Sequence, residues 1–362
     1  MSKLHDVEEP RMKGSCMAQV RYAVSGCPVT HSLSPLLMGL VLSNLEKFGS
    51  SMKLGCTVSS LHLVETEAIE DALGWGYAGH VPNAPAWQYT DAPFGKYRTD
   101  ALMKEAIEAA MLIEDADPRF ASKTADDSLH SLSKEDALLM PAPHAHLPSQ
   151  SLENEVWMNL TSPLKHQLSS DAISTIDESM LLQSVNALRW DGRAWWCAGV
   201  DGNGVVALAL HHGIDATNGA ILGIVGGGGA ARSTADAWLK AGGKIATIAG
   251  RRTLELPYAF ESEDPSDTVD FAVDFDGDLT TQNPFKSCLK RLNPSYCALN
   301  VDLDSRFEAL LSQPFDGRWM LTAQHIEAWK RLWAPHYAHL VPSLDLLLTQ
   351  LVHAESVLAA YT

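Results

Sequence analysis

The sequence lacks several features that mark common classes of protein. Its six cysteines form no C-x-x-C pair, so neither a zinc ribbon nor a disulfide framework is indicated. No run approaches the ~18–20 apolar residues of a membrane span. The segment before about Arg21 is polar and is broken by Pro10 and Gly14, unlike the apolar part of a secretory signal. We therefore expect a cytoplasmic protein with reduced thiols and no membrane partner.

Positive charge is also scarce. The 362 residues include 27 Lys and Arg against 44 Asp and Glu, which gives a formal net charge of −17. A surface that acidic repels the phosphates of nucleic acids and of anionic lipids, so we expect no nucleic-acid partner. An anionic small molecule would need a local positive site. The chain does have 46% hydrophobic residues and 10 Trp, enough for packed cores in two domains of roughly 100–200 residues each.

One stretch is typical of a β-α-β unit that binds a nucleotide. The apolar run at 221–225 predicts a strand, and four glycines at 226–229 follow it directly. Residues 233–241 predict a helix, and 244–248 predict a second strand. Glycines permit a tight turn and let the backbone approach a pyrophosphate, while the helix N-terminus supplies N–H groups. A flexible turn would also explain the glycines alone, but the flanking strand and helix favour a nucleotide site.

The residues after the second strand indicate which dinucleotide binds. Sites for NAD usually place an Asp or Glu about 20 residues past the glycines, where it holds the ribose 2′-OH. Here the sequence is Gly250-Arg251-Arg252-Thr253, with two guanidinium groups and no acid. A forked, permanently charged donor suits a 2′-phosphate, so we expect NADP rather than NAD. The alternative is that one or both arginines are solvated loop residues.

Three further segments combine hydroxyl groups, amides, a lysine and a carboxylate. They are His31-Ser32-Leu33-Ser34-Pro35, Asn159-Leu160-Thr161-Ser162-Pro163-Leu164-Lys165, and the stretch from Val185 to Gly204, which includes Asn186 and Asp201. The first leads into a helix expected at 35–45, with Ser34 as its candidate N-cap. The donors and acceptors of all three suit a polyhydroxylated acid, and Lys165 with Asp201 forms a pair capable of proton transfer.

Together these motifs resemble the shikimate dehydrogenase family. The family's Gly-x-Pro-x-x-His-Ser-x-Ser-Pro matches residues 26–35, and its Asn-Val-Thr-x-Pro-x-Lys matches 159–165. Its Gly-Ala-Gly-Gly-Ala matches 226–230, and its late Asp-Gly-x-x-Met-Leu-x-x-Gln matches 316–324. The motifs occur in the family's order, which makes the resemblance specific. It covers most of the chain except the N-terminal tail and about 74–150.

The resemblance implies an NADP-dependent oxidoreductase that reversibly reduces 3-dehydroshikimate to shikimate in aromatic amino-acid and chorismate biosynthesis. Lys165 and Asp201 would be the catalytic pair, with Lys165 passing a proton to the carbonyl oxygen and Asp201 orienting the lysine. The implied substrate-binding residues are Ser32, Ser34, Thr161, Asn186 and Gln324. The implied cofactor-binding residues are Gly226, Gly228, Gly229, Ala230, Arg251, Arg252, Thr253, Gly317 and Met320. The expected partner is the small-molecule substrate, with a homodimer left open.

The chain departs from the family at three places. Gly199-Val200 stands where the family has Asn-Thr before the aspartate, and 270–277 lacks the family's Asn-Ala-Thr-Pro…Gly-Met loop near the nicotinamide. Residues 302–306 stand where the family has Tyr-Asn-Pro. These departures leave two alternatives open. One is a quinate or shikimate dehydrogenase of different substrate or cofactor preference, and the other is a non-catalytic homologue that binds a metabolite.

The expected fold is α/β and has two domains. An N-terminal α/β substrate domain occupies 1–205, a Rossmann-like NADP-binding domain occupies 206–321, and C-terminal helices at 322–362 return to the substrate domain. Within the first domain we interpret 74–150 as an insertion. It contains one helical pattern, at 100–113.

No metal site is expected. His144, His146 and the His211-His212 pair have no carboxylate or cysteine partner at the spacing of metal ligands. We interpret all of them as loop and surface histidines.

Overall fold

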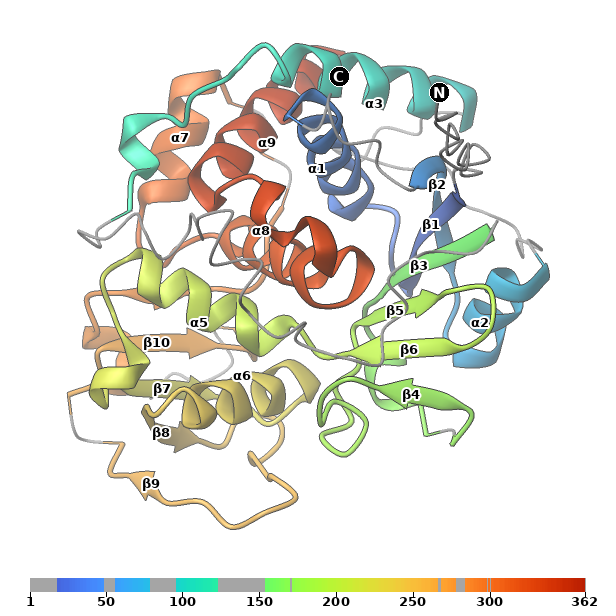
Figure 1. Ribbon diagram of the computed structural model, residues 1–362. Helices are drawn as coiled ribbons and strands as arrows, with labels where there is room; N and C mark the ends of the chain where they lie inside the picture. Colours follow the sequence, from blue (N-terminus) through green and yellow to red (C-terminus); the bar gives the residue numbers. More distant parts are fainter. Residues whose placement is uncertain are drawn as a thin grey trace, which may run out of the picture.

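The computed structural model of the chain describes residues 18–48, 56–78, 96–122, 154–169, 171–265, 268–277, 284–297, 299 and 301–361. Within these ranges the chain forms two β-sheets with helices packed against both (Figure 1). This is the α/β class expected from the sequence. His144 and His146 lie outside the described residues. No helix in the described ranges is both long and apolar enough to cross a membrane.

The first sheet has six strands in the order β2-β1-β3-β5-β6-β4. Its strands are β1 (Ala18–Gly26), β2 (Cys56–Glu65), β3 (Asn154–Leu160), β4 (Ile173–Thr175), β5 (Ala187–Trp190) and β6 (Trp195–Ala198). Strands β2, β1 and β3 run parallel, whereas β5 is antiparallel to both of its neighbours. The carboxyl ends of β1 and β3 therefore meet at one edge of the sheet, which brings together the polar segments that follow them.

The second sheet has five strands in the order β11-β10-β7-β8-β9, and every neighbouring pair is parallel. Its strands are β7 (Ile221–Val225), β8 (Lys244–Ile248), β9 (Ser262–Glu263), β10 (Phe271–Asp274) and β11 (Arg291–Leu292). The predicted β-α-β unit is confirmed, and β7 and β8 have the expected bounds. Its helix begins at Gly229 rather than at Ser233. Glycine has a low helix propensity, so a run of four glycines hides the point at which the helix begins.

The α-helices in the described ranges are α1 (Ser34–Phe48), α2 (Ile69–Ala78), α3 (Lys96–Ala110), α5 (Asp201–His211), α6 (Gly229–Lys240), α7 (Leu303–Leu311), α8 (Gly317–Ala328) and α9 (Leu344–Ala359). A π-turn, η7 (Trp329–Trp333), and a 3-10 turn, η8 (Pro335–Leu340), connect α8 to α9. The shorter 3-10 turns are η2 (Pro118–Phe120), η4 (Leu164–His166), η5 (Ala216–Asn218) and η6 (Pro284–Ser287).

Alternate residues of β1 point to opposite faces of the first sheet, and both faces are buried. Tyr22 and Val24 pack in one hydrophobic cluster together with residues of α1, α8 and α9. Ala23 packs in a second cluster with Trp75 of α2. Figure 1 shows α1, α8 and α9 on one side of this sheet and α2 on the other. The C-terminal helices therefore return to the first sheet, as expected.

The helical pattern predicted at 100–113 forms α3, which begins at Lys96 and ends at Ala110. Met103, Ala106 and Ala110 are buried in the main hydrophobic cluster, and α3 packs against α1 and α9. This part of the predicted insertion is therefore an integral layer of the fold.

The predicted domain boundary between 205 and 206 falls inside α5. This helix packs against both α6 and α8, so it contacts the helices that cover each sheet. Domain boundaries usually fall in exposed linkers that few contacts cross. The division into 1–205, 206–321 and 322–362 stays a prediction.

His325 of α8 is fully buried among aromatic rings. Neither of its ring nitrogens has a hydrogen-bond partner in the part of the chain that the structure describes, and the ring packs against Tyr22 and Trp333. Burial lowers the pKa of His325 from 6.5 to about 3, because the charged form would lose its water and gain no partner. The folded protein therefore keeps this ring neutral at a pH where the unfolded chain binds a proton.

We expect His325 to reduce stability in mild acid. Below pH 6.5 the unfolded state binds one more proton here than the folded state, until the folded pKa near 3 is reached. The free energy of unfolding then falls by about 1.4 kcal/mol per pH unit, or about 2 kcal/mol at pH 5. Urea denaturation at pH 7 and pH 5 should show this loss in the wild type and not in His325→Phe. The exposed His166, changed to Gln, should keep the wild-type difference; an equal loss in His325→Phe would contradict the assignment.

Candidate active site

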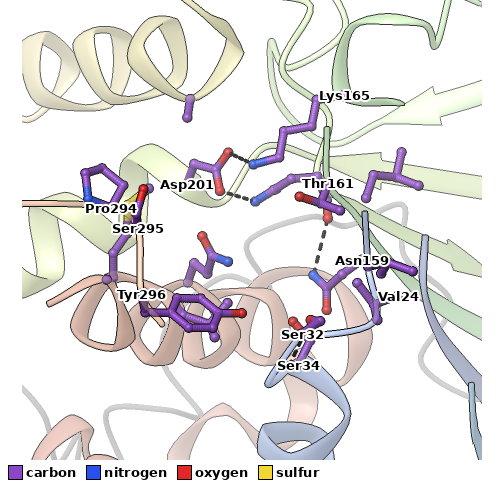
Figure 2. A pocket seen from close by; sticks show the side chains of 18 of the residues that line it. Val24, Ser32, Ser34, Asn159, Thr161, Lys165, Asp201, Pro294, Ser295 and Tyr296 are labelled. Carbon is purple, nitrogen blue, oxygen red and sulfur yellow. Dashed lines mark hydrogen bonds and ion pairs between the residues drawn. The ribbon is translucent and has the colours of Figure 1, made fainter. Parts of the chain in front are cut away.

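A cavity of about 380 Å³ lies where the carboxyl ends of β1 and β3 approach α5 and α8 (Figure 2). It is lined by every residue that the sequence predicts for substrate binding and proton transfer. These are Ser32, Ser34, Thr161, Lys165, Asn186, Asp201 and Gln324. The structure thus brings segments from distant parts of the chain to one place.

Backbone hydrogen bonds join the loops that follow β1 and β3. Thr161 N donates to Ser25 O at 2.8 Å, and Cys27 N donates to Ser162 O at 2.9 Å. Gly26 has a φ of +153°, and a Cβ on it would lie 2.3 Å from Thr161 Cγ2. Only glycine permits this backbone conformation and this close approach. Gly26 therefore allows the two loops to line one cavity.

Lys165 and Asp201 form an ion pair at one end of the cavity. Lys165 Nζ lies 2.6 Å from Asp201 Oδ2, and Figure 2 shows the two side chains facing each other. Asn186 Nδ2 donates to the other carboxylate oxygen, Oδ1, at 2.6 Å. The Asp201 side chain is 1% exposed, whereas that of Lys165 is 22% exposed. The carboxylate is therefore fixed from two sides, while the ammonium group keeps access to the cavity.

The Asn186 amide is itself held in one orientation. Its Oδ1 accepts a hydrogen bond from Val200 N at 2.7 Å, which leaves its NH₂ group directed at Asp201. Asp201 is the first residue of α5, where the positive end of the helix dipole stabilises a carboxylate. Asn186, predicted to bind substrate, thus also positions the Lys165–Asp201 pair.

The other end of the cavity carries hydroxyl groups, and Figure 2 shows Ser32 and Ser34 on the side away from Lys165. Helix α1 begins at Ser34 itself, so Ser34 is not the residue that precedes the helix as predicted. The hydroxyl of Ser32 accepts a hydrogen bond from Ser34 N at 3.2 Å. The Ser32 side chain therefore accepts a hydrogen bond from the first backbone N–H group of α1.

Asn159 and Tyr296 also line the cavity, and the sequence reading assigned a role to neither. Tyr22 Oη donates to Asn159 Oδ1 at 2.5 Å, which orients that amide. Tyr296 Oη accepts from Leu33 N at 3.3 Å, and the Ser32 side chain also interacts with it. Burial raises the pKa of the Tyr296 phenol, so its hydroxyl is neutral at neutral pH.

Residues 302–306 were predicted to stand where the family has Tyr-Asn-Pro after a strand, but no strand directly precedes them within the described residues. They form the start of α7, with Asp302 as its N-cap. An Asn-Pro pair does follow the last strand of the second sheet, because Asn293 and Pro294 come directly after β11. Leu292 precedes this pair, so the chain has Leu-Asn-Pro here. A strand of two residues leaves too short a pattern to mark its end in the sequence.

Helix α8 presents one face to the cavity through Gly317, Met320 and Gln324. Their spacing places them along one side of a helix. A Cβ on Gly317 would lie 2.3 Å from Pro294 O, and a Cβ on Gly204 of α5 would lie 2.9 Å from Gln324 N. These close approaches seat α8 against α5 and the loop that carries Tyr296.

The other predicted cofactor residues lie around the glycine loop between β7 and α6. Gly226 has a φ of +99°, and a Cβ on Gly227 would lie 2.0 Å from Thr253 O. Gly228 is the N-cap of α6, and nothing lies within 4 Å of a Cβ placed on it. The loop is thus open beside a helix N-terminus, which fits a phosphate group. Ala230, in the first turn of α6, also lines the cavity, so the loop and the cavity adjoin.

Arg251 and Arg252 follow β8 beside this loop, and both are exposed. The backbone N and the guanidinium group of Arg251 bind the carboxylate of Asp276, which follows β10. The sequence reading did not assign Asp276 to the site. The glycine loop, the N-terminus of α6 and Arg252 form a donor set that fits the phosphates of a dinucleotide.

His211 and His212 were predicted to lie on the surface, and that prediction is wrong because both are buried. His211 Nε2 lies 2.7 Å from Phe120 O, and the ring of His212 stacks on Phe315 at 4.1 Å between centroids. Among the described residues, no three His, Cys, Asp or Glu side chains gather in a way that could hold a metal ion.

The comparison of sequences gives a short match. No family model matches the chain. A curated relative, shikimate dehydrogenase (NADP(+)) from Methylibium petroleiphilum, is 34% identical over 94 residues, which is 26% of this chain and 32% of that relative. The match thus spans only about a third of the length of that relative.

The comparison of structures covers nearly the whole chain. The shikimate 5-dehydrogenase of Thermus thermophilus, solved in complex with shikimate, matches with a TM-score of 0.50 and 17% identity. The match covers 93% of this chain and 99% of that one. The resemblance that the motifs predict is thus confirmed at the level of the fold, and the chain has the shikimate dehydrogenase fold.

Proposed function

We propose that this chain is a shikimate dehydrogenase, which reduces 3-dehydroshikimate to shikimate with NADPH and catalyses the reverse reaction with NADP⁺. The observation that carries the proposal is the cavity in which the Lys165–Asp201 pair faces hydroxyl groups, next to a β-α-β unit with a glycine loop. The relative from Methylibium is named for this activity with NADP⁺, and the Thermus enzyme was solved with shikimate. Both names support this substrate and cofactor.

The polar groups of the cavity suit a ring that carries a carboxylate and several hydroxyls. Ser32 and Ser34 would donate to the carboxylate, and Thr161, Asn186 and Gln324 would bind the carboxylate and the ring hydroxyls. The cavity volume of about 380 Å³ lies in the range of small-molecule sites. Because the chain as a whole is acidic, these neutral donors and Lys165 supply the local attraction that an anionic substrate needs.

Lys165 is the group that moves the proton. Its ammonium group donates a proton to the ketone oxygen as that oxygen becomes a hydroxyl, and the neutral amine takes a proton back in the reverse direction. Asp201, held by Asn186, keeps the lysine in place. When bound, NADPH supplies the hydride for the reduced carbon.

The glycine loop at 226–229 and the N-terminus of α6 would hold the pyrophosphate, and Arg252 would meet the 2′-phosphate. Gly317 and Met320 line the cavity from α8, where they would contact the part of the cofactor nearest the substrate. This placement brings the two ligands together, which hydride transfer requires.

Shikimate-dependent reduction of NADP⁺, followed by the absorbance of NADPH, tests the proposal. Parallel reactions with quinate and with NAD⁺ measure the preference for substrate and cofactor. A larger kcat/KM for quinate would assign the chain as a quinate dehydrogenase. If the folded protein turns over none of these pairs but binds shikimate in a calorimeter, the chain is instead a non-catalytic homologue.

The remaining expectations concern partners and location. From the net charge of −17 we infer that the chain does not bind nucleic acid, and we propose a cytoplasmic location. Light scattering distinguishes a monomer of 39.3 kDa from a homodimer of twice that mass.

A further inference from the structure

A half-buried carboxylate lies beside the glycine loop. Asp276, in the loop after β10, has a side chain that is only 10% exposed. Its Oδ2 accepts from Arg251 N at 2.6 Å, and its Oδ1 accepts from Arg251 Nη2 at 3.1 Å and Nε at 3.2 Å. Its own backbone N donates to Asp274 Oδ1 at 3.0 Å. These contacts hold the carboxylate in one position.

The Asp276 carboxylate occupies the space that a side chain at residue 250 would fill. A Cβ placed on Gly250 would lie 1.7 Å from Asp276 Oδ2, and a Cβ on Gly226 would lie 3.1 Å from the same oxygen. Position 250 follows β8 and lies 24 residues past Gly226. In dinucleotide-binding folds an acid at about this distance past the glycines bonds the ribose 2′-OH. The sequence has no acid at position 250, but Asp276, from the loop after β10, places a carboxylate there.

We propose that Asp276 is a cofactor-specificity residue, which takes the place of the ribose-binding acid and weakens the preference for a 2′-phosphate that Arg251 and Arg252 create. The site then accepts NAD(H) alongside NADP(H). This inference rests on the proposed function, because it requires that a dinucleotide binds at the glycine loop.

The charges around the loop support this assignment. Asp276 already pairs with Arg251, so Arg251 offers a 2′-phosphate less attraction than a free guanidinium group would. Arg252 is exposed and forms no ion pair within the described part of the chain. A 2′-phosphate drawn to Arg252 would also be repelled by the Asp276 carboxylate. Between a doubly charged anion and a carboxylate in partly exposed surroundings, this repulsion corresponds to about a tenfold change in affinity.

Binding of two small probes tests the proposal without any need for turnover. The probes are 2′,5′-ADP and 5′-AMP, which differ only in the 2′-phosphate, and affinity is measured by calorimetry on the full chain. We expect the wild type to bind 2′,5′-ADP no more than about tenfold more tightly than 5′-AMP. Asp276→Asn keeps the size of the side chain and removes its charge, so it should widen that ratio by about tenfold, mainly by tightening 2′,5′-ADP. The widening should shrink as salt is added.

Glu108→Gln is the matched control. Glu108 is an acid that is 67% exposed on α3, away from α6 and β8 in Figure 1, and its substitution changes the net charge equally. It should leave the ratio unchanged. An unchanged ratio in Asp276→Asn, or a wild type that prefers 2′,5′-ADP more than a hundredfold, overturns the role of Asp276 alone. Failure of the wild type to bind either probe at millimolar concentration overturns the nucleotide site itself.

Discussion

Replacing Lys165 by alanine should lower the rate of shikimate oxidation by about 100- to 10,000-fold, the range that a positioned general acid or base contributes. The reason is that, in the proposed mechanism, Lys165 Nζ exchanges a proton with the substrate oxygen; it lies 2.6 Å from Asp201 Oδ2, and its side chain is 22% exposed. Steady-state kinetics with saturating NADP⁺ measures the effect. Lys104→Ala, which removes a lysine 78% exposed on α3, is the matched control and should retain the wild-type rate.

A second variant separates proton transfer from a merely structural role. Lys165→Ala leaves the buried Asp201 carboxylate without its cation, which also costs stability. Lys165→Arg keeps that pairing, but a guanidinium group stays protonated and cannot act as a base. We therefore expect Lys165→Arg to fold like the wild type, with an unchanged melting temperature, and to lose the rate. A Lys165→Arg protein with near wild-type kcat would refute the assigned role of Lys165.

The predicted residues that line the cavity belong to continuous sequence motifs. The mostly apolar runs at 221–225 and 244–248 predict β7 and β8, because a parallel strand covered on both faces is largely apolar. The segment with Ser32 lies between β1 and α1, and the segment with Thr161 and Lys165 follows β3. Their meeting in one cavity follows from the parallel pairing of β1 and β3, which aligns the strand ends.

Asp276 could not be placed from the sequence, because its position depends on the order of the strands. β10 pairs with β7 on the side away from β8, so the loop after β10 reaches the glycine loop from a distant part of the chain. Tyr296 was missed for a related reason, since it follows β11, a strand of only two residues. Arg251 looked like a free cation in the sequence, and only the folded chain shows it paired. Which charged side chains pair across loops, as Arg251 and Asp276 do, depends on the order of the strands in the sheet.

A buried ion pair between α8 and α9 lies next to the cavity residue Tyr296. Arg318 and Glu355 have side chains 0% and 1% exposed, and Arg318 Nε lies 2.7 Å from Glu355 Oε2. Arg318 also donates to Cys297 O at 2.7 Å and lies 5.5 Å from the centre of the Tyr296 ring. The pair thus joins α8 and α9 and holds the segment that carries Tyr296 into the cavity.

Glu355→Ala should lower the free energy of unfolding by about 3–5 kcal/mol, because it leaves the buried guanidinium group of Arg318 without its main counter-charge. Urea denaturation measures the loss. Glu108→Ala removes an acid that is 67% exposed and pairs with Lys104 at 3.8 Å, so it should cost less than about 1 kcal/mol. The double variant Arg318→Met with Glu355→Leu removes both of these charges, but it leaves Asp316, which lies 3.0 Å from Arg318, without its cation, so it should regain only part of the stability. If Glu355→Ala costs no more than Glu108→Ala, the buried charge is not what holds α8 to α9. In the folded fraction, the shikimate KM of Glu355→Ala should rise, because Tyr296 loses the support that places it beside Ser32.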